Sequence, residues 1–248
     1  MQAALPSKLK EDAIVEALLE IQFESDDLGE IVIGRLSDFD QWSGCSSQRL
    51  NASNIPEGIR DSDPALRYQP VIERRSQDGA SNARIGSHVL SYHAYAPYLG
   101  WSEFRPKLFS IVDELFKKTT NLRITRLGFR YINYLQSGKH SVESPADLTL
   151  SIMLGEEPIV GGFNLSYLDT ISKHHHILTR VVSPDFIESA TRPDDVVCAA
   201  DIDVFTAKDF TTGVKEDILK WIEDAHTAEK EAFFCLFKKD TIELLKSE

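Results

Sequence analysis

Three separate stretches in which apolar and polar residues alternate constrain the fold of this chain more than any other feature. Residues 13–23 read AIVEALLEIQF, residues 126–135 read RLGFRYINYL, and residues 196–205 read VVCAADIDVF. Because successive side chains of a β-strand point to opposite faces, this spacing predicts strands with one buried and one solvated face. We therefore expect a sheet that is covered on one side only.

Two longer segments have apolar residues at helical spacing and would supply the cover. These amphipathic segments are residues 102–118 and 212–237. Further strand-like stretches occupy residues 65–95 and 148–182, whereas the polar residues 43–65 read as a long exposed loop. The pattern predicts an α+β protein in which two long amphipathic helices pack on a large antiparallel sheet.

The domain organisation is expected to be a single α+β unit over residues 1–248. A polar linker at residues 136–147 separates two halves, 1–135 and 148–248. Each half ends its strands with one long amphipathic helix, which is compatible with two similar halves. No repeat at the level of individual residues is strong enough to establish a duplication.

Acidic residues outnumber basic ones in this chain. Its 248 residues include 39 Asp and Glu against 27 Lys and Arg, which gives a formal net charge of −12. Binding to nucleic acid draws most of its sequence-independent energy from Lys and Arg on phosphates, so nucleic acid is not the expected partner. The acidity fits a soluble protein, or one that binds a basic partner.

Nothing in the sequence points to a membrane or to the secretory pathway. No apolar run approaches the roughly 20 residues that cross a bilayer, so no membrane partner is expected. The first residues, MQAALPSKLKEDA, lack the pattern of a secretory signal, and we therefore expect a cytoplasmic location. Cys45, Cys198 and Cys235 are widely spaced, which favours free thiols over disulfides.

Motifs for catalysis or cofactor binding are not apparent, so the sequence predicts no catalytic residue and no cofactor. It contains neither a nucleophile elbow nor a glycine-rich phosphate loop. In KHHHIL, His174 and His176 would share one face of a strand and are weak candidates for metal ligands. Further ligands are not evident nearby, and a solvated histidine cluster is the simpler interpretation. Whether the protein is an enzyme stays open at this point.

Charged residues inside two of the alternating stretches need an explanation. Arg126 and Arg130 share the polar face of one stretch, and Asp201 and Asp203 share the polar face of another. If these strands lie side by side, the four side chains are natural cross-strand ion pairs that brace the sheet. The other reading is an anion pocket in which the arginines bind a phosphate or carboxylate.

Aromatic residues are concentrated in SYHAYAPYLGW, residues 91–101. They could anchor a strand-to-helix corner to the core, or they could line a surface for a ligand or a protein partner. Tyr92 and Tyr95, taken together with Arg126 and Arg130, define a candidate ligand-binding pocket.

Five segments together resemble a sporadically distributed bacterial family of uncharacterised proteins of about this length. They are AIVEALLEIQF, YLGWSEFRPKL, RLGFRYIN, DIDVF and EKEAFFCLF, and their order spans nearly the whole chain. The patchy distribution of this family implies mobile genetic neighbourhoods such as toxin–antitoxin or phage-defence loci.

The function favoured by the sequence is that of a non-enzymatic protein-interaction component of a defence or toxin–antitoxin module. Size, acidity and aromatic surface are present without a catalytic motif, and the expected partner is a protein such as the product of an adjacent gene. The alternative is a small-molecule or nucleotide-binding protein, or an enzyme, with an aromatic and arginine-lined pocket.

Overall fold

One antiparallel sheet organises the whole chain. The computed structural model describes residues 5–6, 9–159, 161–189 and 192–246. Nine strands form this sheet in the spatial order β2-β3-β4-β5-β1-β6-β11-β10-β9, and every neighbouring pair is antiparallel. The strands are β1 (Ile14–Glu24), β2 (Ser46–Arg49), β3 (Ile72–Arg75), β4 (Ser81–Ile85), β5 (Val89–Tyr95), β6 (Arg123–Gln136), β9 (Asn164–Ser172), β10 (His175–Val182) and β11 (Val196–Phe205).

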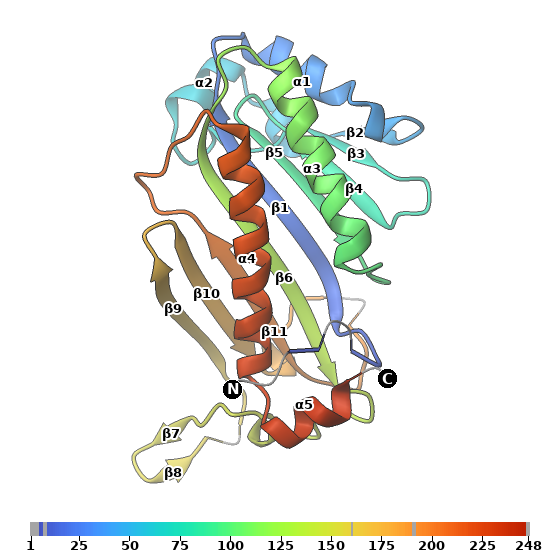
Figure 1. Cartoon of the computed structure of the whole chain (residues 1–248), viewed down its shortest axis with the longest axis vertical. Helices are drawn as coiled ribbons and strands as arrows, with labels where there is room; N and C mark the ends of the chain where they lie inside the picture. Colours follow the sequence, from blue (N-terminus) through green and yellow to red (C-terminus); the bar gives the residue numbers. More distant parts are fainter. Residues whose placement is uncertain (1–4, 7–8, 160, 190–191, 247–248) are drawn as a thin grey trace.

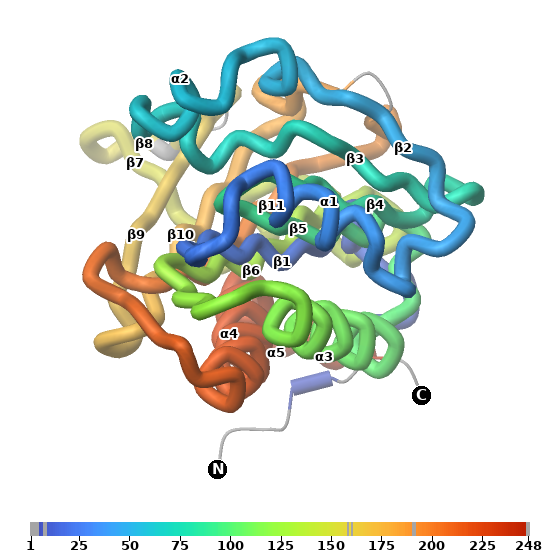
Figure 2. The backbone as a smooth tube through the Cα atoms, turned by 90° about the horizontal axis from the view of Figure 1, so that it is seen from above, coloured from blue at the N-terminus to red at the C-terminus, as the bar shows by residue number. Residues whose placement is uncertain are grey.

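Two long helices cover one face of this sheet, as Figures 1 and 2 show. They are α3 (Trp101–Lys118) and α4 (Lys215–Cys235). Shorter elements complete the described chain: α1 (Gly29–Ser37), α2 (Glu57–Ser62), α5 (Lys239–Leu245), and a small hairpin of β7 (Met153–Leu154) and β8 (Glu157–Pro158). The predicted α+β class, with a large antiparallel sheet and two long packed helices, is confirmed.

The alternation of apolar and polar residues along the central strands explains why helices cover only one face of the sheet. In β1, β6 and β11 the apolar positions pack under the helices, and Leu19, Phe129 and Ile202 are at most 1% exposed. The alternate positions, which face away from α3 and α4, are mostly half-buried and polar. A strand with this pattern can bury only one face, so the helices have to lie on that side.

The two parts of the chain repeat the same topology. From β1 outward the sheet continues through β5, β4 and β3, and from β6 outward it continues through β11, β10 and β9. A long helix follows the last strand of each set, α3 after β5 and α4 after β11. In this scheme β6 belongs with the second set of strands, and the 136–147 linker that composition indicated follows it directly.

Two regions differ from the expected secondary structure. Residues 43–65, expected as a long exposed loop, contain β2 and α2. All four residues of β2 are exposed, so this edge strand has no apolar alternation by which a sequence pattern could reveal it. The stretch 148–154, expected as a strand, forms only the two residues of β7.

The other expectations for the fold concern membranes and cysteines. No helix in the described part of the chain is long and apolar enough to span a bilayer. Cys45, Cys198 and Cys235 are all free thiols.

Candidate functional site

The face of the sheet opposite α3 and α4 carries a layer of charged side chains. Even-numbered positions of β1 and β6 point to this face together with odd-numbered positions of β5 and β11, because these residues pair across neighbouring strands. The carboxylate, guanidinium and imidazole side chains of this polar face on the four central strands are Glu16, Glu20, Glu24, His93, Arg126, Arg130, Asp201 and Asp203.

Arg130 and Asp201 form the strongest pair of this layer. The Nε and Nη2 atoms of Arg130 each donate a hydrogen bond of 2.6 Å to one carboxylate oxygen of Asp201. In the register of β6 and β11, Arg130 lies opposite Asp203, so its contact with Asp201 is a diagonal one. Bidentate pairing of this kind orients both side chains and favours their charged forms.

Arg126 is engaged by a different strand from the one that the sequence indicated. Its Nη1 atom donates to the Oε1 atom of Glu20 on β1 at 2.7 Å. The guanidinium lies over Gly128, since a Cβ atom built on that glycine would be 2.9 Å from Nη1 of Arg126. Gly128 therefore provides the space in which the Arg126 side chain crosses the sheet.

Asp203 is the unusual member of the four charged residues. Within the described chain its carboxylate makes no hydrogen bond, although it lies near both arginines. Desolvation raises the pKa of Asp203 to about 6, an effect that the positive charges of Arg126 and Arg130 oppose. Burial therefore outweighs the attraction of two nearby cations at this position.

A second group of polar contacts continues across β3, β4 and β5. Glu73 accepts hydrogen bonds from Asn82 at 3.0 Å and from Arg75 at 2.9 Å. Between β5 and β1, the Nδ1 atom of His93 lies 2.7 Å from Oε1 of Glu16. Most charges on this face are thus paired with an opposite charge, and Asp203 is the exception.

The four residues of the expected ligand pocket are not brought together. Tyr92 lies on the helix side, stacked between Trp42 and Phe104 with ring centroids 5.9 Å away in each case. Tyr95 lies on the polar face, where its hydroxyl accepts a hydrogen bond from Asn82. Both tyrosines border a cavity of about 170 Å³ at the end of β5, and neither Arg126 nor Arg130 lines it.

The histidine pair expected as a weak metal site is also separated. His174 lies in the turn before β10 and not in a strand, with its ring edge-on to Phe210. His176 lies within β10, where its Nδ1 atom is 2.9 Å from the Thr170 hydroxyl. Across the residues that the structure describes, no group of three or more His, Cys, Asp or Glu side chains is arranged to hold a metal ion.

A cleft that the sequence did not indicate lies on the helix side, between α3 and the outer strands. It has a volume of about 630 Å³, and Trp42, Arg74, Tyr92 and Lys107 are among its lining residues. The Nε atom of Arg74 and the Nε2 atom of Gln41 are buried donors without a hydrogen-bond partner. Two unsatisfied donors beside a lysine and an aromatic wall make this cleft suitable for an anionic ligand.

The outer edge of the sheet at β9 is exposed along nearly its full length. Every residue of β9 except Leu165 is exposed, and β10 is its only hydrogen-bonded neighbour strand among the described residues. Tyr167, Leu168 and Ile171 are each more than half exposed. An edge strand of this kind offers unpaired backbone groups and apolar side chains to another extended segment.

No protein-family model matches the chain, and no curated protein matches it in sequence.

Proposed function

We propose that this protein is a non-enzymatic interaction module that binds an extended segment of a basic partner protein along strand β9. The observation that carries the proposal is the exposed edge of β9, with Tyr167 and Leu168 both 59% exposed. Addition of a strand at such an edge gains main-chain hydrogen bonds, while flanking side chains provide specificity. The net charge of −12 favours a basic partner over an acidic one.

The chain resembles a sporadically distributed bacterial family, and this resemblance suggests that the partner is the product of an adjacent gene. In a toxin–antitoxin or phage-defence module, an acidic binding protein would hold the basic component in a complex. This role places the protein in the cytoplasm with its partner and requires no cofactor.

A pair of lysine substitutions in β9 provides the test of this surface. Replacing both Tyr167 and Leu168 by lysine should weaken binding of the adjacent gene product by about tenfold or more, because lysines on an edge strand oppose strand addition and repel a basic partner. Binding can be measured by calorimetry with the two purified proteins.

The matched control replaces Leu99 and Leu244 by lysine. These leucines are 70% and 61% exposed and lie outside β9, so their replacement adds the same charge without altering the edge. Equal loss of binding in both double variants would contradict the proposal. It would also be contradicted if the unbound protein forms a dimer that only the β9 variant abolishes, because a second copy would then occupy the edge.

A second candidate function is the binding of an anionic small molecule, such as a nucleotide, in the cleft beside α3. It rests on the unsatisfied Nε atom of Arg74 and on the neighbouring Lys107. The sequence indicated a pocket of this chemistry, although with Arg126 and Arg130 in place of Arg74.

Thermal unfolding in the presence of a nucleotide panel tests this second candidate. A ligand present at 100 times its dissociation constant should stabilise the protein by about 2.7 kcal/mol. Arg74→Gln should remove the response, whereas Arg75→Gln, at the next position but on the opposite face of β3, should keep it. If no nucleotide raises the melting temperature, or if both variants respond like the unchanged protein, this function is excluded.

A further inference from the structure

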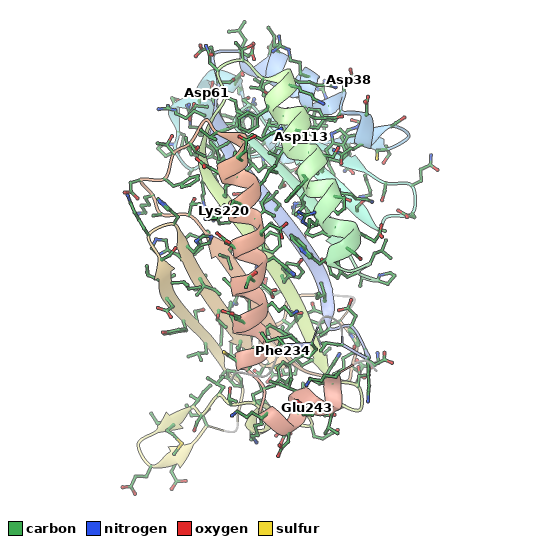
Figure 3. The ribbon with its side chains drawn as sticks, in the orientation of Figure 1. Asp38, Asp61, Asp113, Lys220, Phe234 and Glu243 are labelled. Carbon is green, nitrogen blue, oxygen red and sulfur yellow. The ribbon has the colours of Figure 1, made fainter. Side chains whose placement is uncertain are left out.

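A small cavity beneath the C-terminal half of α4 is distinct from the surfaces described so far. It has a volume of about 120 Å³ and lies between α4, the start of α3, and strands β1 and β6. Phe234, which Figure 3 labels near the lower end of α4, is one of its lining residues. At about 30 Å³ per water molecule, the space corresponds to roughly four waters or one small organic group.

Glu229 gives this cavity its chemical character. It projects from the buried side of α4, is 6% exposed, and forms no hydrogen bond or ion pair with any described residue. Desolvation raises the pKa of Glu229 to about 8, and the positive charge of the adjacent Lys230 opposes this effect. A buried carboxyl without a partner is costly, so the position would be expected to hold an apolar residue unless another group complements it.

Aromatic rings form one side of the remaining wall, and a histidine ring lies among them. The rings of Trp101 and His226 stack with their centroids 3.9 Å apart, and the hydroxyls of Tyr98 and Tyr131 are hydrogen-bonded to each other at 2.8 Å. The Nδ1 atom of His226 is buried and has no hydrogen-bond partner. Desolvation lowers the pKa of His226 to about 4, so this ring is neutral at pH 7 and does not supply a positive charge to Glu229.

The combination of a carboxyl and aromatic walls selects one class of ligand. An anion would be repelled by Asp12, which also lines the cavity, and by Glu229 whenever its carboxyl is ionised. A cation gains both an ion pair with the carboxylate and attraction to the aromatic rings that line the cavity. The lining therefore favours a small cation over an anion or an apolar molecule.

We propose that this cavity binds a small organic ammonium group, with the Glu229 carboxylate as its counter-ion and the rings of Trp101, Tyr98 and Tyr131 as its wall. Binding requires the ionised carboxylate, so a proton passes from Glu229 to solvent as the cation enters. Lys230 lines the same cavity and competes with the ligand for the carboxylate. The site is separate from the β9 edge, and its test does not depend on the partner protein.

The tetramethylammonium ion is a suitable probe because its charge does not change with pH. Calorimetric titration of the full chain at constant ionic strength should show saturable binding, and tert-butanol, an uncharged molecule of similar size, should bind about tenfold more weakly or worse. Below the pKa of Glu229, affinity should rise about tenfold for each unit of pH, because binding releases one proton.

Variants of α4 identify the counter-ion. Glu229→Gln should weaken binding of tetramethylammonium by about tenfold or more. Glu231→Gln, which changes an exposed glutamate of the same helix, should leave binding unchanged. Lys230→Gln should strengthen binding, since it removes the competing cation, and this variant keeps the test valid even if Glu229→Gln does not fold.

Three results would overturn the proposal. They are equal affinity for tetramethylammonium and tert-butanol, unchanged affinity in Glu229→Gln, and the lack of saturable binding by both the unchanged protein and Lys230→Gln.

Discussion

Glu229→Gln is expected to raise the free energy of unfolding by about 3 kcal/mol at pH 7 in the absence of ligand. In the folded protein the pKa of Glu229 is raised from 4.5 to about 8, mainly by desolvation. The unfolded chain therefore loses this proton at lower pH than the folded protein does. Each pH unit between these two values costs the folded state about 1.4 kcal/mol, and glutamine avoids this cost because it carries no proton to lose.

The sign of the pH dependence makes the prediction specific. The contribution of protonated Glu229 to stability is fully present below pH 4.5 and is lost as the pH rises through about 8. The two proteins should thus be equally stable near pH 4.5 and should diverge as the pH increases. Other titratable or charged groups that line the cavity are common to both proteins and cancel in the difference: Asp12, Tyr98, Tyr131, His226 and Lys230.

Urea unfolding at a series of pH values measures this difference directly. Glu231→Gln is the control, and it should follow the unchanged protein throughout because this glutamate is exposed. A constant difference between Glu229→Gln and the unchanged protein from pH 4.5 to pH 8 would show that the carboxyl is not desolvated as the structure indicates.

Arg130→Ala is expected to lower the free energy of unfolding by about 2 kcal/mol. Removing one partner of a buried pair costs about 3–5 kcal/mol, but the Arg130 side chain is 38% exposed, so solvent screening reduces the loss. The change leaves the Asp201 side chain, which is 16% exposed, without its two hydrogen bonds. It also removes one of the two cations that oppose the raised pKa of Asp203.

A double variant distinguishes a bracing pair from an anion site. Arg130→Met combined with Asp201→Leu should recover at least part of the lost stability, since the Asp201 carboxylate is then no longer left without its partner. Arg105→Ala is the control, because Arg105 and its partner Glu223 are both more than one-third exposed and should contribute little. If Arg130→Ala leaves stability unchanged in urea unfolding, the arginine does not brace the sheet and an anion site becomes the better explanation.

Much of the fold was predictable because its central strands bury one face only. The alternation in β1, β6 and β11 identified both the strands and their polar face, and the helical spacing identified α3 and α4. The sequence could not show that β6 pairs with β1 on one side as well as with β11 on the other. For that reason, the pairing of Arg126 with Glu20 was missed.

The candidate sites were harder to predict because their residues come from distant segments. Glu229, Tyr98 and Tyr131 meet only after α4 and α3 pack on the sheet. One signal was nevertheless present in the sequence: Glu229 follows Ile222 and Ala225 on the buried stripe of α4, where a carboxyl is out of place. The edge at β9 left no such signal, because a strand pattern does not reveal how many neighbours the strand has.

The central position of β1 has a consequence for the order in which the chain can be assembled during synthesis. In the register of the sheet, Leu19 lies between Tyr92 of β5 and Phe129 of β6. Strand β6 is complete only when residue 136 has left the ribosome. The sheet around β1 therefore cannot form until more than half of the chain has been synthesised. Closing such long loops before their contacts form slows folding. Until then, one of the most apolar strands of the protein has an unpaired edge, and a chain released before β6 would present it to other chains.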